Sequence, residues 1–152
     1  WATQRGVAPE KLIFGGRLAY ADHSARYRLA DLVLDTLPFN GGATTSDALW
    51  AGAPVLTCLG ETFAGRMAAS LLNAIGLPEL IARSLAEYET LAQELAADRQ
   101  SLSAIRRKLS ENRATHPLFD TGLFAKHLES AYVTMWQRHQ AGQAPDHIQV
   151  QA

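Results

Sequence analysis

Short apolar runs alternate with helix-like stretches through the first half of the sequence, and this alternation limits the fold more than any other feature. The runs LIF (12–14), LVLDTL (32–37) and PVLTCL (54–59) are each bounded by glycine, proline or aspartate, as buried strands usually are. Strand and helix units this short predict an α/β fold with parallel pairing. We therefore expect a Rossmann-like parallel sheet with flanking helices, in which ligands bind at the carboxyl ends of the strands.

Start and stop signals delimit the helices between these runs. The stretch HSARYRLA predicts a short helix that begins near Asp22 or Ser24. Further along, Thr44 and Asp47 form a T-x-x-D start signal, and Gly52 is a stop signal. The sequence therefore places a second helix directly after a glycine-rich turn.

The second half of the chain is predicted to be mainly helical. Ser84 and Glu87 form a capping box after the short apolar pair at 80–81, and from Asp98 onward the pattern is helical apart from a break at Pro117. A cluster near the end recurs at helical spacing, which favours packing over ligand recognition; its members are Tyr132, Met135 and Trp136. Residues 143–152 are predicted to be a tail.

Composition narrows the class of protein. A chain of 152 residues, 47% hydrophobic and 19% charged, is expected to fold around one core, so residues 1–152 are predicted to be a single lobe. The net charge of -1 gives no general attraction to nucleic acid or to an anionic membrane, so any anion must be bound locally.

The single Cys58 excludes an internal disulfide and favours a reducing, cytoplasmic location. No apolar run reaches the roughly 20 residues that span a bilayer. Because the sequence opens without methionine, we expect a fragment of a longer chain.

The turn FNGGATTSD is the first candidate site. A turn from a strand into a helix gathers backbone N–H groups at the positive end of the helix dipole, where an anion such as phosphate binds. Gly41 and Gly42 let the anion approach, and Thr44, Thr45 and Ser46 offer hydroxyl groups. The alternative is a well-capped helix start without a ligand. Asp47 has the wrong charge for a phosphate contact, so it either caps the helix or accepts hydrogen bonds from ribose hydroxyls.

Two further segments are predicted to reach the same edge of the sheet. His23 and Arg26 are three residues apart on one helix face, where Arg26 suits a diphosphate and His23 a hydrogen-bond donor. Either residue alone is more often a solvated surface residue. Glu61 and Thr62 follow the third apolar run and either touch a sugar or phosphate or form a simple helix start with Thr62 as its cap. Three turns at one edge make a site.

Residues 31–72, together with later stretches, resemble a known enzyme family. The run DLVLDTLPFNGGATTSDALWAGAPVLTCLGETFAGRMAASLL resembles the C-terminal catalytic lobe of O-linked N-acetylglucosamine transferases and SPINDLY-like proteins. The agreement continues through LPELIA, HPLFDTGLF and YVTMWQRHQAGQAPDHI, and it extends from about Gly6 to His147.

This resemblance implies the second lobe of a GT-B glycosyltransferase with a helical C-terminus. The family transfers N-acetylglucosamine from UDP-GlcNAc to Ser or Thr hydroxyls of a protein or peptide, with inversion, without a metal and without a cofactor. The lobe on its own is then expected to be inactive, since the catalytic base, the acceptor-side groups and any tetratricopeptide repeats would lie upstream of Trp1. The resemblance implies no nucleic-acid or membrane partner.

The family pattern also implies roles for individual residues. His23 and Arg26 match its diphosphate ligands, with Arg26 stabilising the leaving group, and Asp47 matches its ribose ligand. The phosphate turn falls on Gly42, Ala43 and Thr44, with Thr45 as a substitute hydroxyl and Gly41 beside it. The segment that contacts the base falls on residues 18–20, including Leu18 and Tyr20.

Two departures from the pattern leave the donor open. Tyr20 stands in place of a lysine, and Gly42 stands in place of a histidine. A GDP-fucose-dependent O-fucosyltransferase lobe and a non-catalytic nucleotide-binding half-domain are therefore the alternatives.

Overall fold

The computed structural model describes residues 2–150 and contains a three-stranded parallel sheet. The strands are β1 (Val33–Leu34), β2 (Val55–Cys58) and β3 (Ile81–Ala82), in the order β1-β2-β3. Val33 lies opposite Val55, and Thr57 lies opposite Ile81. All four residues of β2 are buried, as expected for the central strand of a sheet covered on both faces. The predicted α/β class is confirmed.

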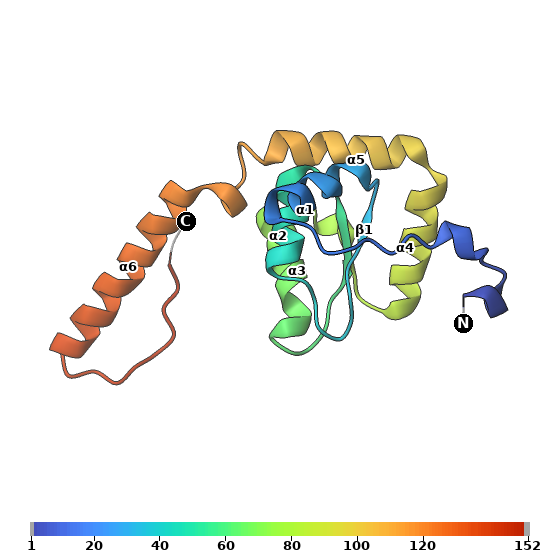
Figure 1. The fold of residues 1–152 in the computed structure, drawn as a ribbon. Helices are drawn as coiled ribbons and strands as arrows, with labels where there is room; N and C mark the ends of the chain where they lie inside the picture. The colour runs from blue at the N-terminus through green and yellow to red at the C-terminus, as the bar shows by residue number, and fades with distance from the viewer. Residues whose placement is uncertain (1, 151–152) are drawn as a thin grey trace.

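Six α-helices accompany the sheet in the described part of the chain. Their bounds are α1 (Tyr20–Arg26), α2 (Ala43–Ala51), α3 (Met67–Ala74), α4 (Leu85–Ala97), α5 (Arg99–Asn112) and α6 (Thr121–Gln140). Figure 1 shows α2 and α3 on one side of the sheet and α4 on the other, with α5 running across one end. Short 3₁₀ turns lie between these elements. Since α1 packs beside α2, the helix that carries His23 and Arg26 adjoins the glycine turn.

The core lies between the sheet and its helices. Leu49 of α2, Val55 of β2 and Leu72 of α3 are fully buried, and Leu109 of α5 belongs to the same cluster. Burying such side chains contributes about 1.5–3 kcal/mol each. This cluster holds α2 against β2, so it fixes the helix whose N-terminus forms the candidate site.

The predicted strand at 12–14 is wrong. This segment has no regular structure, and Ile13 and Phe14 are each 91% exposed. A strand requires a neighbour that completes its hydrogen bonds, and among residues 2–150 the only strand pairs are β1 with β2 and β2 with β3. The apolar character of the run indicated burial, but it did not supply a partner.

Two predicted helix starts also differ from the structure. Helix α1 begins at Tyr20, ahead of Asp22, because Ala19 enters it from an extended conformation and accepts the first helical bond from His23 N–H at 2.9 Å. Helix α2 has Gly42 as its N-cap residue, so Thr44 and Asp47 lie inside the helix and do not form a capping box. The stop at Gly52 is confirmed by its left-handed φ of 87°.

The capping box of α4 is confirmed, and it gives a first prediction. Ser84 Oγ accepts from Glu87 N–H at 3.1 Å, while Glu87 Oε2 accepts from Arg83 N–H at 2.6 Å. Replacing Ser84 with alanine should lower the free energy of unfolding by about 1 kcal/mol in a denaturant titration. The matched control is Ser103→Ala on the exposed surface of α5. An equal loss in both variants would contradict a capping role.

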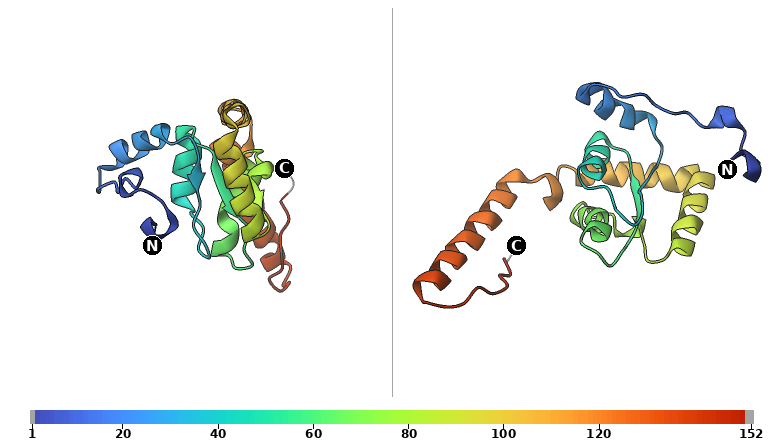
Figure 2. Two further views of the ribbon diagram at one scale, coloured as in Figure 1. Left: turned by 90° about the vertical axis from the view of Figure 1, so that its right-hand side faces the viewer. Right: turned by 60° about the horizontal axis from the view of Figure 1, so that its bottom comes forward.

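Helix α6 projects away from the rest of the molecule, as Figures 1 and 2 show. None of its residues is buried, and Tyr132, Met135 and Trp136 are 59%, 49% and 62% exposed. These side chains are largely exposed in the described chain, as expected for a lobe taken alone, and their role in packing stays a prediction. Residues 143–150 form no regular element, although Arg138 bonds back to Ala144 O at 2.8 Å; residues 151–152 of the predicted tail lie outside the described residues.

Within residues 2–150, no helix is long and apolar enough to cross a membrane. No group of three or more His, Cys, Asp or Glu side chains in that same range is arranged to hold a metal ion.

Candidate functional site

The candidate site is the N-terminus of α2, where the chain arrives from the carboxyl end of β1. The first helical bond runs from Ser46 N–H to Gly42 O at 3.0 Å, so the amides of Ala43, Thr44 and Thr45 precede the helical ladder. These amides, together with the helix dipole, make the entrance to α2 electropositive. The structure therefore supplies the kind of backbone environment that binds an anion.

Asp35, which the sequence analysis did not single out, holds this turn. Its Oδ1 accepts from Gly41 N–H at 2.7 Å and from Thr36 N–H at 2.9 Å, and its Oδ2 accepts from Thr57 Oγ1 at 2.6 Å. The carboxylate thus ties the turn to the ends of β1 and β2. The only signal in the sequence was an acidic residue directly after an apolar run. That signal is weak because a solvated turn has the same pattern.

Both turn glycines have close neighbours inside the protein. A Cβ atom on Gly41 would lie 2.6 Å from Thr44 Oγ1 and 2.6 Å from Thr45 Oγ1. A Cβ on Gly42 would lie 2.6 Å from Met67 Cε of α3. Such distances are too short for a carbon atom, so a side chain at Gly41 would displace the two threonines, whereas at Gly42 the flexible end of Met67 would have to move aside.

The hydroxyl groups of the turn differ in access. Thr44 is exposed, and so is Ala43, whereas Thr45 is only 3% exposed. Thr44 is therefore the accessible threonine in this structure. The neighbouring Asn40 is fully buried, and its Oδ1 has no hydrogen-bond partner among the described residues.

His23 and Arg26 are brought together on α1. One guanidinium nitrogen of Arg26 lies 2.9 Å from His23 Nδ1, and another donates to Gly16 O at 3.3 Å. A guanidinium group only donates, so His23 Nδ1 is the acceptor and a neutral ring carries its proton on Nε2. This arrangement orients the guanidinium and leaves Nε2–H as a second donor.

Asp47 also faces α1. Its Oδ1 accepts from the Tyr20 hydroxyl at 3.0 Å, across 27 positions of sequence. Burial, followed by the charge of Asp47, raises the pKa of the Tyr27 phenol, while Arg26 lowers that pKa. Asp47 of α2 and Arg26 of α1 thus both lie near Tyr27, where α1 packs beside α2.

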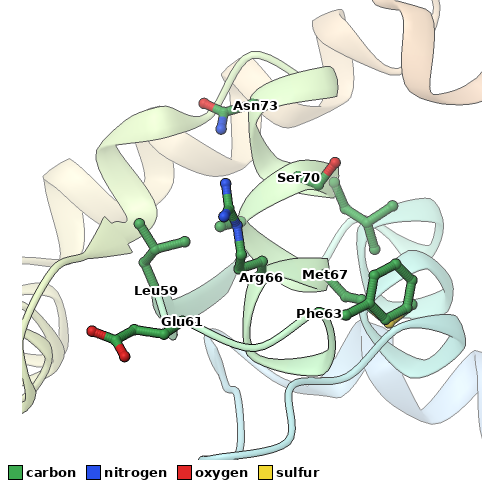
Figure 3. A pocket seen from close by; sticks show the side chains of 9 residues that line it. Leu59, Glu61, Phe63, Arg66, Met67, Ser70 and Asn73 are labelled. Carbon is green, nitrogen blue, oxygen red and sulfur yellow. The ribbon is translucent and has the colours of Figure 1, made fainter. Parts of the chain in front are cut away.

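The remaining predicted residues lie at the margins. Leu18 is 46% exposed ahead of α1. Thr62 Oγ1 accepts from Gly65 N–H at 3.0 Å, a local bond within the turn before α3, although Thr62 is not the N-cap residue of a helix as predicted. Exposed Glu61 lines a cavity of about 790 Å³ beside α3, and Figure 3 shows Arg66 lying between Glu61 and Asn73 there. Met67 lines the same cavity and packs against Gly42, so the cavity adjoins the glycine turn.

Comparison with known proteins connects this geometry to one family. The family described as Glycosyl transferase family 41 matches residues 1–128. The chain is 42% identical over 99% of its length to a probable UDP-N-acetylglucosamine–peptide N-acetylglucosaminyltransferase, SEC, of Arabidopsis thaliana. It is 36% identical over 97% of its length to a UDP-N-acetylglucosamine–peptide N-acetylglucosaminyltransferase of Caenorhabditis elegans. It is 43% identical over 93% of its length to a SPINDLY protein of Petunia hybrida that carries the same probable enzyme name.

A solved structure agrees with these relatives. The chain superposes on a mutant form of the O-GlcNAc transferase of Thermobaculum terrenum with a TM-score of 0.82 and 40% identity, covering 88% of the chain and 26% of that protein. The chain spans only 16%, 13% and 15% of the lengths of the three curated relatives. Its fold is thus that of one lobe of such an enzyme. The chain belongs to glycosyl transferase family 41.

Proposed function

We propose that the chain is the donor-binding lobe of a protein O-glycosyltransferase, and that it binds UDP-GlcNAc for transfer to Ser or Thr hydroxyls with inversion and without a metal or a cofactor. The observation that carries this proposal is the position of Asp47 and the His23–Arg26 pair on the side of the lobe where α1 meets α2. Relatives named as UDP-N-acetylglucosamine–peptide N-acetylglucosaminyltransferases support the choice of donor.

The diphosphate is proposed to rest at the entrance to α2. As the bond from the sugar to the diphosphate breaks, negative charge develops on the leaving group, and donors already in place stabilise that charge without reorganising. The amides of Ala43 and Thr44 and the exposed Thr44 hydroxyl are one set of donors. His23 Nε2–H and the Arg26 guanidinium are the other set. Charged groups of the protein thereby take the role that a metal ion has in other transferases.

The ribose is proposed to bind Asp47. The structure removes the competing role of this residue, because Gly42 is the N-cap of α2 and Asp47 lies in the body of the helix. Its carboxylate instead faces α1 and accepts a hydroxyl hydrogen bond there. A ribose hydroxyl is the same kind of donor.

The acceptor side and the catalytic base are proposed to come from another part of a longer polypeptide. The chain covers 26% of the related solved structure, which leaves room for a first lobe. The exposed apolar face of α6, with Tyr132 and Trp136, is proposed to pack against that lobe. The 152-residue chain is then expected to bind the donor without transferring sugar.

A second donor, GDP-fucose, remains the alternative because Tyr20 bonds to Asp47 where the family pattern has a lysine. Calorimetry with UDP-GlcNAc, UDP, GDP-fucose and GDP separates the two donors. Tighter binding of the uridine nucleotides supports the proposal, and tighter binding of the guanosine nucleotides replaces it with the alternative. The absence of binding to any of the four would leave a half-domain without a nucleotide site.

The ribose role of Asp47 gives a second prediction. Asp47→Asn should weaken the affinity for UDP about ten-fold, because a hydrogen bond to a charged acceptor contributes about 1.5–3 kcal/mol. The melting temperature should change little, since the helix start does not use this carboxylate. Asp22→Asn, an exposed carboxylate on α1, is the control and should leave affinity unchanged. Unchanged UDP affinity in Asp47→Asn would exclude the ribose role.

A further inference from the structure

The Tyr20 hydroxyl is hydrogen-bonded to Asp47, the residue that we propose as the ribose ligand. The hydroxyl donates to Asp47 Oδ1 at 3.0 Å. The tyrosine is 71% exposed and stands at the first position of α1. The hydrogen bond is therefore a surface contact between two helices, and most of the ring lies in solvent.

From this contact we propose that Tyr20 is a placeholder for the nucleotide. Its hydroxyl holds Asp47 in the empty lobe, and the ribose hydroxyls of the incoming nucleoside diphosphate displace it. This inference rests on the proposed function, because it takes Asp47 as the ribose ligand. It assigns Tyr20 the role of setting affinity for the ribose, in place of the base contact that the family pattern implied.

The chemistry of the two donors favours displacement. A phenol and a ribose hydroxyl each donate one O–H, so both suit the same carboxylate oxygen. A carboxylate oxygen can accept two hydrogen bonds, so the competition is for space beside Oδ1 and not for a single acceptor site. A ribose that bonds to both oxygens of Asp47 must approach Oδ1, where the Tyr20 phenol lies, and we infer that the phenol moves away to admit it.

Exposure makes that movement inexpensive. Because the Tyr20 ring is largely in solvent, no core packing is lost when it turns outward. An exposed hydrogen bond of this kind favours the arrangement in which Tyr20 is bonded to Asp47, over the one in which the bond is broken, by a factor of about five. The apparent affinity is the intrinsic affinity multiplied by the fraction of molecules in which Tyr20 has already released Asp47, so Tyr20 should weaken ribonucleotide binding about five-fold.

The test is the Tyr20→Phe variant with two ligands. UDP should bind this variant about five-fold more tightly than it binds the wild-type chain. UDP lacking both ribose hydroxyls, 2′,3′-dideoxy-UDP, should bind the two proteins equally, since it cannot compete for Asp47. Tyr132→Phe on α6 is the matched control, because it removes an exposed phenol hydroxyl far along the chain from the site and should change neither affinity.

The outcomes separate this inference from the proposed function. Weaker UDP binding by Tyr20→Phe would show that Tyr20 orients Asp47, and unchanged binding would show that the contact has no effect on the site. Either result overturns the placeholder role of Tyr20, whereas the ribose role of Asp47 is tested separately by the Asp47→Asn variant. Equal tightening of UDP and its dideoxy analogue would also overturn it, since the effect would not pass through the ribose. A wild-type chain that binds neither UDP nor GDP overturns the proposed function and this inference together.

Discussion

Arg26→Ala is expected to lower the turnover of the complete polypeptide that carries this chain about 100-fold, and by no less than about ten-fold. Loss of one donor that is already oriented toward developing charge removes about 3 kcal/mol of transition-state stabilisation. In the structure the guanidinium is held by His23 Nδ1 and Gly16 O, so its removal also frees the histidine ring that it orients. The measurement is steady-state sugar transfer to a peptide at saturating donor.

The matched control for Arg26 is Arg28→Ala. Arg28 is exposed two residues further along and carries the same charge, so its removal tests general electrostatic attraction. We expect little change in that variant. Arg26→Lys keeps the charge but loses the planar fork, and we expect it to recover only part of the rate. Wild-type turnover in Arg26→Ala would remove this residue from the mechanism.

Gly41→Ala is expected to reduce UDP affinity more than ten-fold and to lower the free energy of unfolding by about 2 kcal/mol, in the range of overpacked sites. The added Cβ would meet Thr44 Oγ1 and the buried Thr45 Oγ1 at 2.6 Å. Thr45 is buried and has little room to adjust, so we expect the turn itself to move. That movement breaks the 2.7 Å bond from Gly41 N–H to Asp35 and misplaces the amides of α2. Calorimetry and denaturant titration measure the two effects.

Gly16→Ala is the control for the glycine substitution. A Cβ at Gly16 would have no other atom within 4 Å, so both affinity and stability should stay close to wild type. If Gly41→Ala bound UDP as tightly as Gly16→Ala, the turn would not be the anion site.

Much of the sheet and of its helices follows from the sequence because local signals and packing agree there. The runs at 32–37 and 54–59 contain the strands β1 and β2, and Ser84 caps α4 as its spacing predicts. The run at 12–14 has the same apolar character but no strand partner in the described chain, and its side chains are exposed. Apolarity indicates that a segment is suited to burial, whereas pairing depends on what lies next to it in space.

The candidate site was predictable where one short segment contains the whole signal. The turn at residues 41–45 leads into a helix, as its glycines and threonines indicated. Contacts between distant segments were not predictable, because the sequence of one segment does not indicate which other segment it will contact. Tyr20 meets Asp47, and Asp35 meets Thr57, only once the sheet has brought α1, α2 and β2 together. The burial of Thr45 and the exposure of Thr44 likewise depend on the rotation of α2 against the core.

The most direct measurement of the central claim is an amide NMR titration of the chain with UDP and with pyrophosphate. Our account predicts that the amides of Ala43 and Thr44 shift with both ligands, because both place a diphosphate at the entrance to α2. The signals of Tyr20 and Asp47 should shift with UDP alone, because only UDP carries a ribose. Saturable UDP binding that left Ala43 and Thr44 unchanged, and instead moved the amides around Glu61 and Arg66, would contradict the account.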